Sequence, residues 1–301
     1  MYANIIFFRI FAIKTINHLK VYSKRMNKKY FFVFCKDELL LEQKDDGTFT
    51  IPFQEVPPTE VKPWTQILNV TPLDGCEVKA YSIDAPITME ENYQIVNSKS
   101  ANRKSFTMSP LRQSYYKLPE QLYLKAGKCA ELLYWDHNTK FCGVCGGMMH
   151  FHTDISKRCD QCGKEVWPQL ATAVIVLIHR GPNEVLLARG RNFKRDFFGL
   201  IAGFVETGET LEQAVEREVL EETGLHIKNL RYYDSQPWPY PSGLMVGFHA
   251  DYAGGDLHVQ REELKKAAWF HRDHLPNLPE KLSIARRLID DWLGIQPSVI
   301  Q

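Results

Sequence analysis

The chain has 301 residues, 44% of them hydrophobic and 24% charged, which is ordinary for a globular protein and enough for roughly two domains. Its 37 basic and 36 acidic residues leave a formal net charge of +1, which argues against a general polyanion-binding protein. Seven cysteines, an odd number, without a cleavable secretory signal indicate a reducing compartment, and we expect a cytoplasmic protein.

The first 25 residues carry basic and apolar side chains and no acidic one. Arg9, Lys14 and Lys20 interrupt their apolar stretch, so it cannot span a bilayer, which requires ~20 apolar residues. Three interpretations of this extension are open: a translated stretch before a true start at Met26, an amphipathic surface or targeting segment, or an ordinary first strand or helix. No membrane span is predicted elsewhere in the chain.

Within residues 26–135, where we expect one domain, the chain from about Tyr30 to Glu120 alternates short aromatic or β-branched runs with turn signals such as Asp45-Asp46-Gly47. This pattern predicts a small α+β domain without a catalytic constellation. At the end of this domain, apolar residues recur with helical spacing, which predicts a helix over residues 118–135.

Four cysteines form two Cys-x2-Cys pairs separated by thirteen residues, the spacing of a zinc ribbon, which we expect over residues 136–168. Four thiolates leave no open coordination position, so the Zn²⁺ would be structural, and a small ribbon would unfold without it. Two disulfides or a redox pair are competing interpretations, and His150 or His152 could replace a thiolate. The expected ligands are Cys142, Cys145, Cys159 and Cys162.

Residues 171–178 are continuously apolar, which predicts a buried strand, and residues 184–188 are its expected hairpin partner across Gly181-Pro182-Asn183. A basic run then extends from Arg189 to Arg195. Two interpretations of this run are equally open: a solvated turn, or a rim that contacts phosphate.

A helix is predicted over residues 211–223. Thr210 followed by Gln213 is a capping pair, and Gly224 is a left-handed stop. Arg217, within the helix, should pair with one glutamate a turn away and bind another in the preceding loop. These two partners are Glu221 and Glu209.

Glu218 and Glu222 fall within the apolar arc of this helix, at about 100° per residue, so both carboxylates face the expected core. Burying ionised carboxylates without a partner costs several kcal/mol, and a cation between them would relieve that cost. Hard carboxylate oxygens suit Mg²⁺ or Mn²⁺, which would also take oxygens from a phosphorylated substrate. A solvated acidic face is the alternative, but these acids lie on the inner face.

Residues 235–242 contain three prolines, which restrict φ and remove backbone donors, so we expect a stiff extended loop rather than a strand. Trp238 and Tyr240 within it offer planar faces on which a base or nicotinamide ring could stack. A core or dimer contact is the alternative. Further along, the pattern predicts a strand over 244–252, an acidic turn over 260–264 and an amphipathic helix over 281–293.

The sequence GFVETGETLEQAVEREVLEETGL, at residues 203–225, resembles the box of the Nudix hydrolases at every defined position. The order of ribbon, box and SQPWPYP loop is similar to that of the NADH pyrophosphatase family, whose bacterial members also remove NAD caps from RNA. The resemblance covers about residues 141–293. It implies an α+β fold with a Nudix α/β/α sandwich over residues 169–301, after the ribbon and the amino-terminal α+β domain, and a homodimer.

The resemblance also implies roles for individual residues. Glu218, Glu222 and Glu263 resemble the family's metal ligands and are joined by the backbone carbonyl of Ala202, while Glu221 is similar to a third box acid. The box residues with structural roles are Gly203, Glu209, Arg217 and Gly224. The implied substrate contacts are Asp154, Trp167, Gln236, Pro237, Trp238, Pro239, Tyr240, Pro241, Ser242, Gly243 and Ala285.

Three positions depart from the family pattern. Family loops often end Pro-x-Ser, whereas here Ser242-Gly243 follows the last proline, so a hydroxyl contact is lost at Gly243 or shifted to Ser242. Asp154 stands where the family usually has Glu, and Trp167 where Tyr is frequent. Ring stacking should be retained, while hydrogen bonding near the nicotinamide should differ.

The resemblance implies hydrolysis of NAD(H) to NMN(H) and AMP, and removal of NAD caps from RNA to leave a 5′-monophosphate end. Mg²⁺ or Mn²⁺ held by the acids would clamp the pyrophosphate and activate water, with Glu221 or Glu263 as the candidate base. Two alternatives are open: a general Nudix hydrolase acting on ADP-ribose or an oxidised nucleotide, and a nucleic-acid-binding ribbon protein with a vestigial box.

Overall fold

The computed structural model describes residues 27–87, 105–193 and 195–295, and the chain divides into two compact units, 1–168 and 169–301. The possible interpretations of the first 25 residues therefore concern a segment outside the described residues. Within the described ranges, none of the helices is both long enough and apolar enough to cross a membrane.

The first unit contains a seven-stranded sheet. Its strands are β1 (Lys29–Cys35), β2 (Glu38–Gln43), β3 (Phe49–Thr50), β4 (Phe53–Gln54), β5 (Leu68–Leu73), β6 (Cys76–Ser82) and β7 (Ser105–Pro110). The main order is β3-β2-β1-β6-β5, with β4 beside β1 and β7 beside β2. The apolar strand β1 lies in the centre, antiparallel to β2 and parallel to β6, and is buried over its last five residues.

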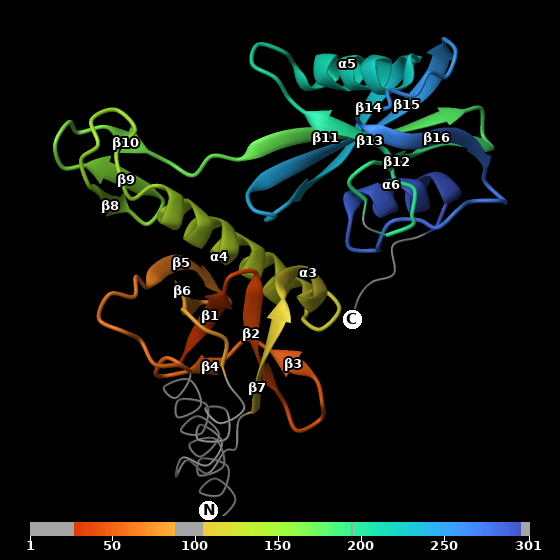
Figure 1. Ribbon diagram of the computed structural model, residues 1–301. Coiled ribbons are helices and arrows are strands. Elements are labelled where there is room, and N and C mark those ends of the chain that lie inside the picture. The colour runs from red at the N-terminus through yellow and green to blue at the C-terminus, as the bar shows by residue number, and fades with distance from the viewer. Residues whose placement is uncertain (1–26, 88–104, 194, 296–301) are drawn as a thin grey trace, which may run out of the picture. The chain divides into compact units, whose positions relative to one another are not determined.

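Two helices follow this sheet in the chain: α3 (Leu111–Ser114) and α4 (Glu120–Asn138). The helix predicted over residues 118–135 is confirmed as α4, although it begins after Pro119 and ends three residues later than expected. Proline fits the position before the first helical residue because it needs no N–H partner there. Figure 1 shows α4 leading from the sheet to the ribbon strands within the same unit.

The ribbon is a three-stranded sheet in the order β10-β9-β8. Its strands are β8 (Met149–Thr153), β9 (Ser156–Cys159) and β10 (Glu165–Val166). Lys157 of β9 is buried, and its ammonium group lies 2.7 Å from the carboxylate of Asp136 and donates to the Asp136 carbonyl at 2.9 Å. A buried cation paired in this way ties the ribbon to the carboxyl end of α4.

The second unit contains a six-stranded sheet. Its strands are β11 (Ala171–Arg180), β12 (Glu184–Gly190), β13 (Ile201–Phe204), β14 (His226–Pro237), β15 (Gly243–Gly254) and β16 (Leu264–His271). The order is β14-β15-β11-β12-β16, with β13 beside β11. The predicted buried strand and its hairpin partner are confirmed as β11 and β12, and β11 also runs parallel to β15.

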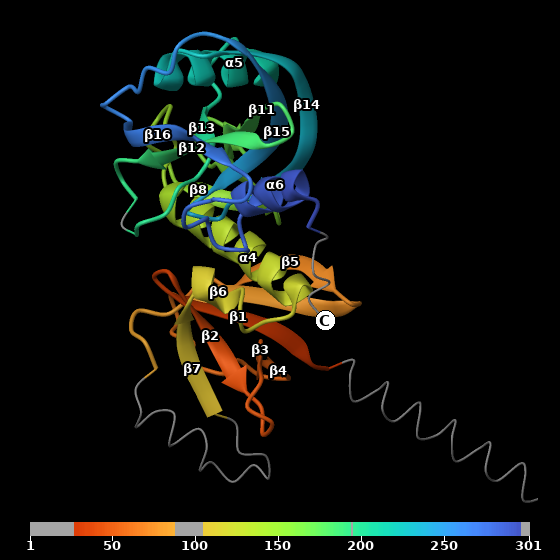
Figure 2. The same cartoon turned by 90° about the vertical axis from the view of Figure 1, so that its right-hand side faces the viewer.

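Helices α5 (Leu211–Thr223) and α6 (Ile284–Leu293) cover opposite faces of this sheet (Figures 1 and 2). Val215 and Val219 of α5 are fully buried in one core, and Leu288 and Ile289 of α6 are fully buried in the other. Alternate residues of β11 enter the two cores, as its period of two requires. The expected α/β/α sandwich is therefore confirmed.

Two boundaries in this unit differ from the prediction. Ser235 to Pro237 belong to β14 and pair with Leu244 to Val246 of β15, so the loop begins only at Trp238. The expectation that the prolines would exclude a strand was wrong for this part, because Pro237 is the last residue of β14, where the missing N–H interrupts no further pairing. Helix α6 begins at Ile284 rather than Lys281, because the Ser283 hydroxyl accepts from the N–H of Arg286 and caps it.

Candidate active site

Helix α5 carries most of the acids of the candidate site, and its ends are capped as the sequence predicts. The Thr210 hydroxyl accepts a bond from the N–H of Gln213, and the Gln213 side chain accepts one from the N–H of Thr210. At the other end, Gly224 has a left-handed φ of +69°. The first N–H groups and the last carbonyl groups of a helix have no hydrogen-bond partner within the helix, and these caps supply some of the missing partners. Helix α5 accordingly covers the predicted residues 211–223.

Arg217 connects α5 to the loop in front of it. Its guanidinium donates to the Glu209 carboxylate at 2.7 and 3.0 Å and to the Phe204 carbonyl at 2.9 Å. It also donates to Glu218 at 2.9 Å and to Glu221 at 3.2 Å. The predicted bonds to Glu209 and Glu221 are confirmed.

This contact has an electrostatic consequence for the loop. The Arg217 guanidinium, helped by the backbone N–H of Glu206, lowers the pKa of Glu209 to about 2. The hydrogen bonds that Arg217 donates to its carboxylate partners, first of all Glu209, in turn raise the pKa of Arg217. Both groups are therefore charged throughout the physiological range, and the pair holds the loop against the helix.

Glu218 and Glu222 face inward, as the helical pattern predicts. Glu222 is 7% exposed, and the side chain of Glu218 is 14% exposed. The Glu218 carboxylate lies directly over Gly203 of β13, where an added Cβ would overlap it. A larger residue at position 203 would therefore displace the carboxylate of Glu218 from this place.

The two inward acids differ in electrostatic environment. Burial, followed by the negative charges of three neighbouring glutamates, raises the pKa of Glu222 to about 8. Burial also raises the pKa of Glu218, although the Arg217 guanidinium opposes this effect. Among the described residues, Glu222 finds no hydrogen bond or ion pair for its carboxylate. A bound cation would stabilise such a group in its ionised form.

A turn before β16 adds a fourth acid, Glu263, to the site. The N–H of Gln260 donates to the Glu222 carbonyl at 3.0 Å, and the N–H of Leu264 donates back to the Gln260 carbonyl at 2.9 Å. The charge of Glu263 is among those that raise the pKa of Glu222. The structure thus brings together the four acids that the resemblance assigned to metal binding and catalysis.

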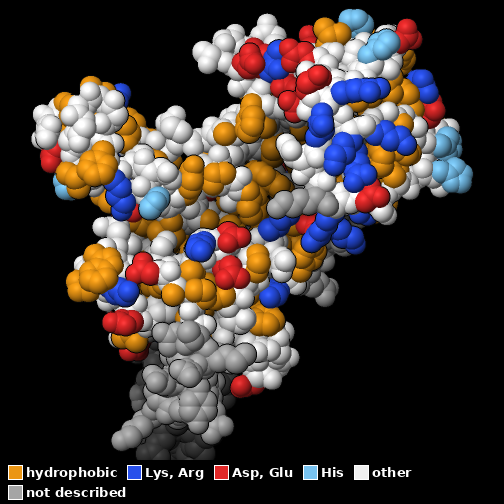
Figure 3. Space-filling view, in the orientation of Figure 1, with side chains coloured by type: hydrophobic (Ala, Val, Ile, Leu, Met, Phe, Trp, Pro, Cys, Tyr) orange, Lys and Arg blue, Asp and Glu red, His pale blue; other side chains and the backbone are white. Residues whose placement is uncertain are grey.

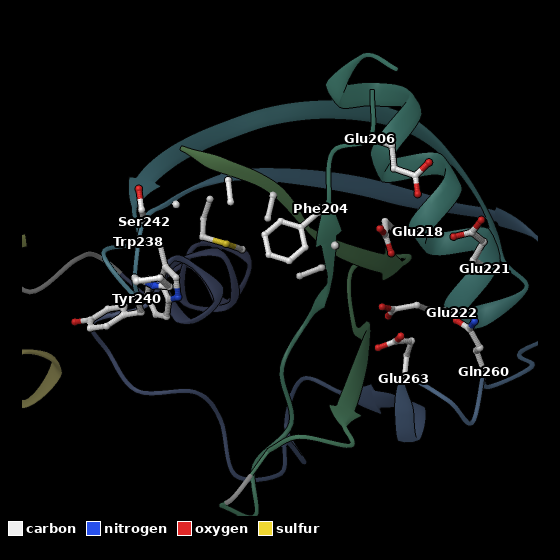
Figure 4. A pocket seen from close by; sticks show the side chains of 17 residues that line it. Phe204, Glu206, Glu218, Glu221, Glu222, Trp238, Tyr240, Ser242, Gln260 and Glu263 are labelled. Carbon is white, nitrogen blue, oxygen red and sulfur yellow. The ribbon is translucent and has the colours of Figure 1, made fainter. Parts of the chain in front are cut away.

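These acids line one end of a cavity of about 640 Å³ that lies entirely within the second unit. Figure 4 shows Glu218, Glu222 and Glu263 directed toward the same space, with Trp238 and Tyr240 at the opposite end. Of the remaining predicted residues, Ala202, Gly203, Pro241, Ser242 and Gly243 also line the cavity.

The loop after β14 forms the aromatic end of the cavity. The rings of Trp238 and Tyr240 lie edge to face, with centroids 5.1 Å apart and planes at 73°. The N–H of Trp238 donates to the Gly243 carbonyl at 2.8 Å, and the Ser242 hydroxyl donates to the Gln169 carbonyl at 2.9 Å. These bonds hold the loop that carries the two rings. The Ser242 hydroxyl, which the sequence suggested for a substrate contact, is thus already bonded to a backbone carbonyl.

Six residues that line the cavity received no site role from the sequence: Ala171, Ala173, Phe204, Glu206, Met245 and Gln260. Phe204 is 66% exposed, and its ring lies between the acids and the aromatic loop in Figure 4. It shares a strand face with Ala202, so the alternation of side chains along β13 was a usable signal. Gln260 carried no such signal, because its position depends on the turn described above.

Two predicted substrate contacts have structural partners instead. The Gln236 amide donates to the Leu282 carbonyl at 2.7 Å and accepts from the N–H of Ile284 at 2.6 Å, so it fastens the start of α6. Ala285 is 8% exposed and packs in the core beneath α6. Neither residue lines the cavity.

The other predicted contacts lie outside the cavity as well. Pro237 and Pro239 belong to the segment around the aromatic loop but do not line the cavity. Asp154 and Trp167 are exposed residues of the first unit. Arg189 and Arg191 of the basic run are also absent from the lining, and Lys194 lies outside the described residues.

The four predicted zinc ligands converge in the ribbon. The Sγ atoms of all four lie within 4.8 Å of one another, with 3.6 Å between Cys142 and Cys162 and 3.4 Å between Cys145 and Cys159. These separations suit a tetrahedral ion and are too long for disulfides. His150 and His152 are not part of this cluster, so neither replaces a thiolate.

The residues at the acidic end of the cavity suit a metal by the chemistry of their oxygens, although among the described residues only the four thiolates form a group of three or more ligand atoms within 4.8 Å of one another. The acids offer hard oxygens, the carboxylate of the buried Glu222 has no partner among the described residues, and Gly203 leaves room for the carboxylate of Glu218. Mg²⁺ and Mn²⁺ prefer such oxygen ligands, whereas Zn²⁺ prefers the sulfur atoms of the ribbon.

Comparison with known proteins covers both units. A model of the NUDIX domain matches residues 169–293, and a model of the NADH pyrophosphatase-like rudimentary NUDIX domain matches residues 28–135. The crystal structure of a NUDIX hydrolase from Nitrosomonas europaea aligns with a TM-score of 0.45 and 24% identity, over 52% of this chain and 91% of that one.

Relatives of similar sequence carry the name NAD-capped RNA hydrolase NudC. The chain is 47% identical over 171 residues to the protein of Pectobacterium atrosepticum, an alignment that covers 56% of this chain and 65% of that protein. It is 46% identical over 188 residues to the protein of Deinococcus radiodurans, covering 61% of this chain and 67% of that one. The chain thus matches about two thirds of the length of these relatives.

Proposed function

Since the chain belongs to the Nudix hydrolases and, within them, to the NADH pyrophosphatase family, we propose that it hydrolyses the pyrophosphate bond of NAD(H) to NMN(H) and AMP. The proposal extends to NAD-capped RNA, which would be left with a 5′-monophosphate end. The name of the relatives, NAD-capped RNA hydrolase, supports this extension.

One observation carries the proposal: a single cavity is lined by five carboxylates and by two aromatic rings in edge-to-face contact. A dinucleotide has a diphosphate between two ring systems, so it presents both chemistries that the cavity offers. The diphosphate would lie at the acidic end. One ring system would stack on Trp238 or Tyr240, or on the exposed ring of Phe204, for ~1–3 kcal/mol.

Glu218, Glu222, Glu263 and the carbonyl of Ala202 would hold Mg²⁺ or Mn²⁺. When bound, these ions would offset the charge of the pyrophosphate oxygens and make water more acidic. The chain itself contributes geometry. Arg217 holds Glu218 in place by a bond of 2.9 Å, and Gly203 leaves the space that this carboxylate occupies.

Glu221 or Glu263 would accept the proton of the water that attacks phosphorus. Glu221 is half-exposed and bonded to Arg217, whereas Glu263 projects from the turn before β16. Replacing each by Gln and recording kcat against pH distinguishes the two. Loss of the base removes the acidic limb of the profile, while loss of a ligand alone raises the metal concentration required.

The function is tested by incubating the protein with Mn²⁺ and, separately, NADH, ADP-ribose and NAD-capped RNA, and by identifying the products. We expect NMNH and AMP from NADH, and monophosphorylated RNA from the capped substrate. Trp238→Ala and Tyr240→Ala should lower kcat/KM for NADH by about 10-fold or more. Trp64→Ala removes an exposed ring of the first unit and is the matched control.

Two results would contradict the proposal. Faster hydrolysis of ADP-ribose than of NADH, unchanged in the two aromatic variants, would favour a general Nudix hydrolase. Salt-dependent RNA binding without metal-dependent turnover would favour a binding protein with an inactive box.

We also propose a structural Zn²⁺ in the ribbon, a cytoplasmic location and a homodimer. Four thiolates must remain reduced to bind zinc, which supports a reducing compartment. The dimer follows only from the family resemblance, and light scattering on the purified chain would test it.

A further inference from the structure

The turn that carries Glu263 has few contacts of its own. Residues 261–263 are exposed and precede the edge strand β16. Within the turn, the N–H groups of Glu263 and Leu264 both donate to the Gln260 carbonyl, at 3.3 and 2.9 Å. An exposed turn of this kind does not by itself keep a carboxylate within the short range that metal coordination demands.

Two attachments fix this turn to the rest of the unit. On one side, the bond from Gln260 to the Glu222 carbonyl ties it to the end of α5. On the other side, Arg191 binds it twice. The backbone N–H of Arg191 donates to the Glu263 carbonyl at 2.8 Å, and its guanidinium Nη1 donates to the Arg261 carbonyl at 2.7 Å.

The local register of β12 and β16 explains how Arg191 reaches the turn. Arg189 is paired with Lys266 and Gly190 with Leu264, so the register shifts by one residue at this point. The shift brings Arg191, immediately after β12, beside the two carbonyls of the turn. Arg191 thus lies at the back of Glu263, outside the cavity lining.

We propose that Arg191 is a positioning residue, whose guanidinium holds the 261–263 turn so that Glu263 stays beside Glu222. This inference rests on the proposed metal-dependent function. A charge-assisted bond to a backbone carbonyl is stronger than a neutral one, and supporting contacts of this kind commonly change metal affinity by roughly 10- to 100-fold.

The other described arginines of the basic run have different partners. Arg189 lies 2.7 Å from Asp196, and Arg195 pairs with Glu280. Figure 3 shows basic side chains gathered near acidic ones in the second unit, so the loss of any one charge there would change the local field. Arg195→Met is therefore the charge-matched comparison for Arg191→Met, because it removes a cation from the same loop without touching the turn.

The experiment measures Mn²⁺ affinity by electron paramagnetic resonance of free Mn²⁺ on the full chain without substrate. We expect Arg191→Met to weaken Mn²⁺ binding about 10-fold, at the lower end of the range for supporting contacts, while Arg195→Met binds as the wild type does. Arg191→Lys should recover part of the loss, since an ammonium group can still donate to the Arg261 carbonyl. Thermal unfolding without Mn²⁺ should be unchanged in Arg191→Met.

A double-mutant cycle with Glu263→Gln gives the sharpest test. If Arg191 acts through Glu263, Arg191→Met should have no further effect on Mn²⁺ affinity in the Glu263→Gln background. The inference would be overturned if Arg191→Met lowered Mn²⁺ affinity equally in the wild-type and Glu263→Gln backgrounds, or if it changed the affinity of the wild type by less than 2-fold. An equal loss of Mn²⁺ affinity in Arg195→Met would overturn it as well. Failure of the proposed function is distinguishable, because it would leave Mn²⁺ binding intact while NADH remained uncleaved.

Discussion

Replacing Glu222 by Gln should stabilise the protein in the absence of Mg²⁺ and Mn²⁺ and at the same time remove its activity. The substitution keeps the size of the side chain and removes a negative charge that is 7% exposed and faces three other acids. The same charge that weakens the metal-free fold is the one that would bind the metal.

The magnitude follows from the pKa of Glu222, which burial and the neighbouring charges raise to about 8 from 4.5. At about pH 7 the folded chain keeps this carboxyl mostly protonated while the unfolded chain ionises it, and this difference would lower stability by ~3 kcal/mol at full strength. Because the group lines a cavity open to water, screening reduces the cost, and we expect Glu222→Gln to gain ~1–2 kcal/mol.

The sign of the pH dependence is fixed by the direction of the shift. Below pH 4.5 the carboxyl is protonated in both the folded and the unfolded chain, so the wild type suffers no penalty. As the pH rises from 4.5 to about 8, the unfolded chain releases the proton before the folded one does, and wild-type stability falls. The advantage of Glu222→Gln should therefore grow across this interval and stay constant above it.

Urea unfolding of both proteins across this interval, with zinc retained and Mg²⁺ absent, measures the difference. Adding Mg²⁺ should stabilise the wild type more than the variant and reduce or reverse the gap. Turnover of NADH by the variant should fall by at least ~100-fold. The reasoning would be refuted if the variant were no more stable than the wild type at about pH 8, or if it retained turnover.

Three further predictions concern the same molecule. Gly203→Ala should displace the Glu218 carboxylate and lower kcat/KM by about 100-fold with little change in unfolding temperature; activity within 3-fold of the wild type would contradict this. Glu209 has a pKa of about 2, so it contributes stability that is complete above pH 4.5 and is lost as the pH falls toward 2. Glu209→Gln should therefore flatten the acid limb of the profile of unfolding free energy against pH. An unchanged acid limb would count against a stabilising pair of Glu209 and Arg217. Removing zinc with a chelator, or replacing Cys142 by Ser, should unfold the ribbon while leaving the strands of the second unit folded. Circular dichroism measures the loss of ribbon structure, and a zinc-binding dye measures the released metal. A ribbon that stays folded would exclude a structural ion.

The parts of the site that depend on neighbours in sequence were predictable without a structure. The limits of α5, its capping pair, the inward direction of Glu218 and Glu222 and the bonds of Arg217 all involve residues within a few turns of one another. The helical period alone determines which of these side chains share a face. The two cysteine pairs are local in the same sense.

Contacts between distant segments required the tertiary structure. Gln236 was predicted to meet substrate but fastens α6, because the packing of β14 against that helix brings its amide to Ile284. Alternation along β13 puts Phe204 on the face of Ala202, but only the tertiary structure brings the aromatic loop to the other side of the cavity from its ring.

The proposed metal site therefore has two origins. The sequence alone determined that α5 offers two buried carboxylates to a cation, since a helix sets its own side-chain directions. Only the tertiary structure decided that Glu263 joins them, because its turn is held by Glu222 on one side and by Arg191, 70 residues before Arg261, on the other. Backbone bonds between such distant segments form only once the strands have packed, and no local pattern encodes them.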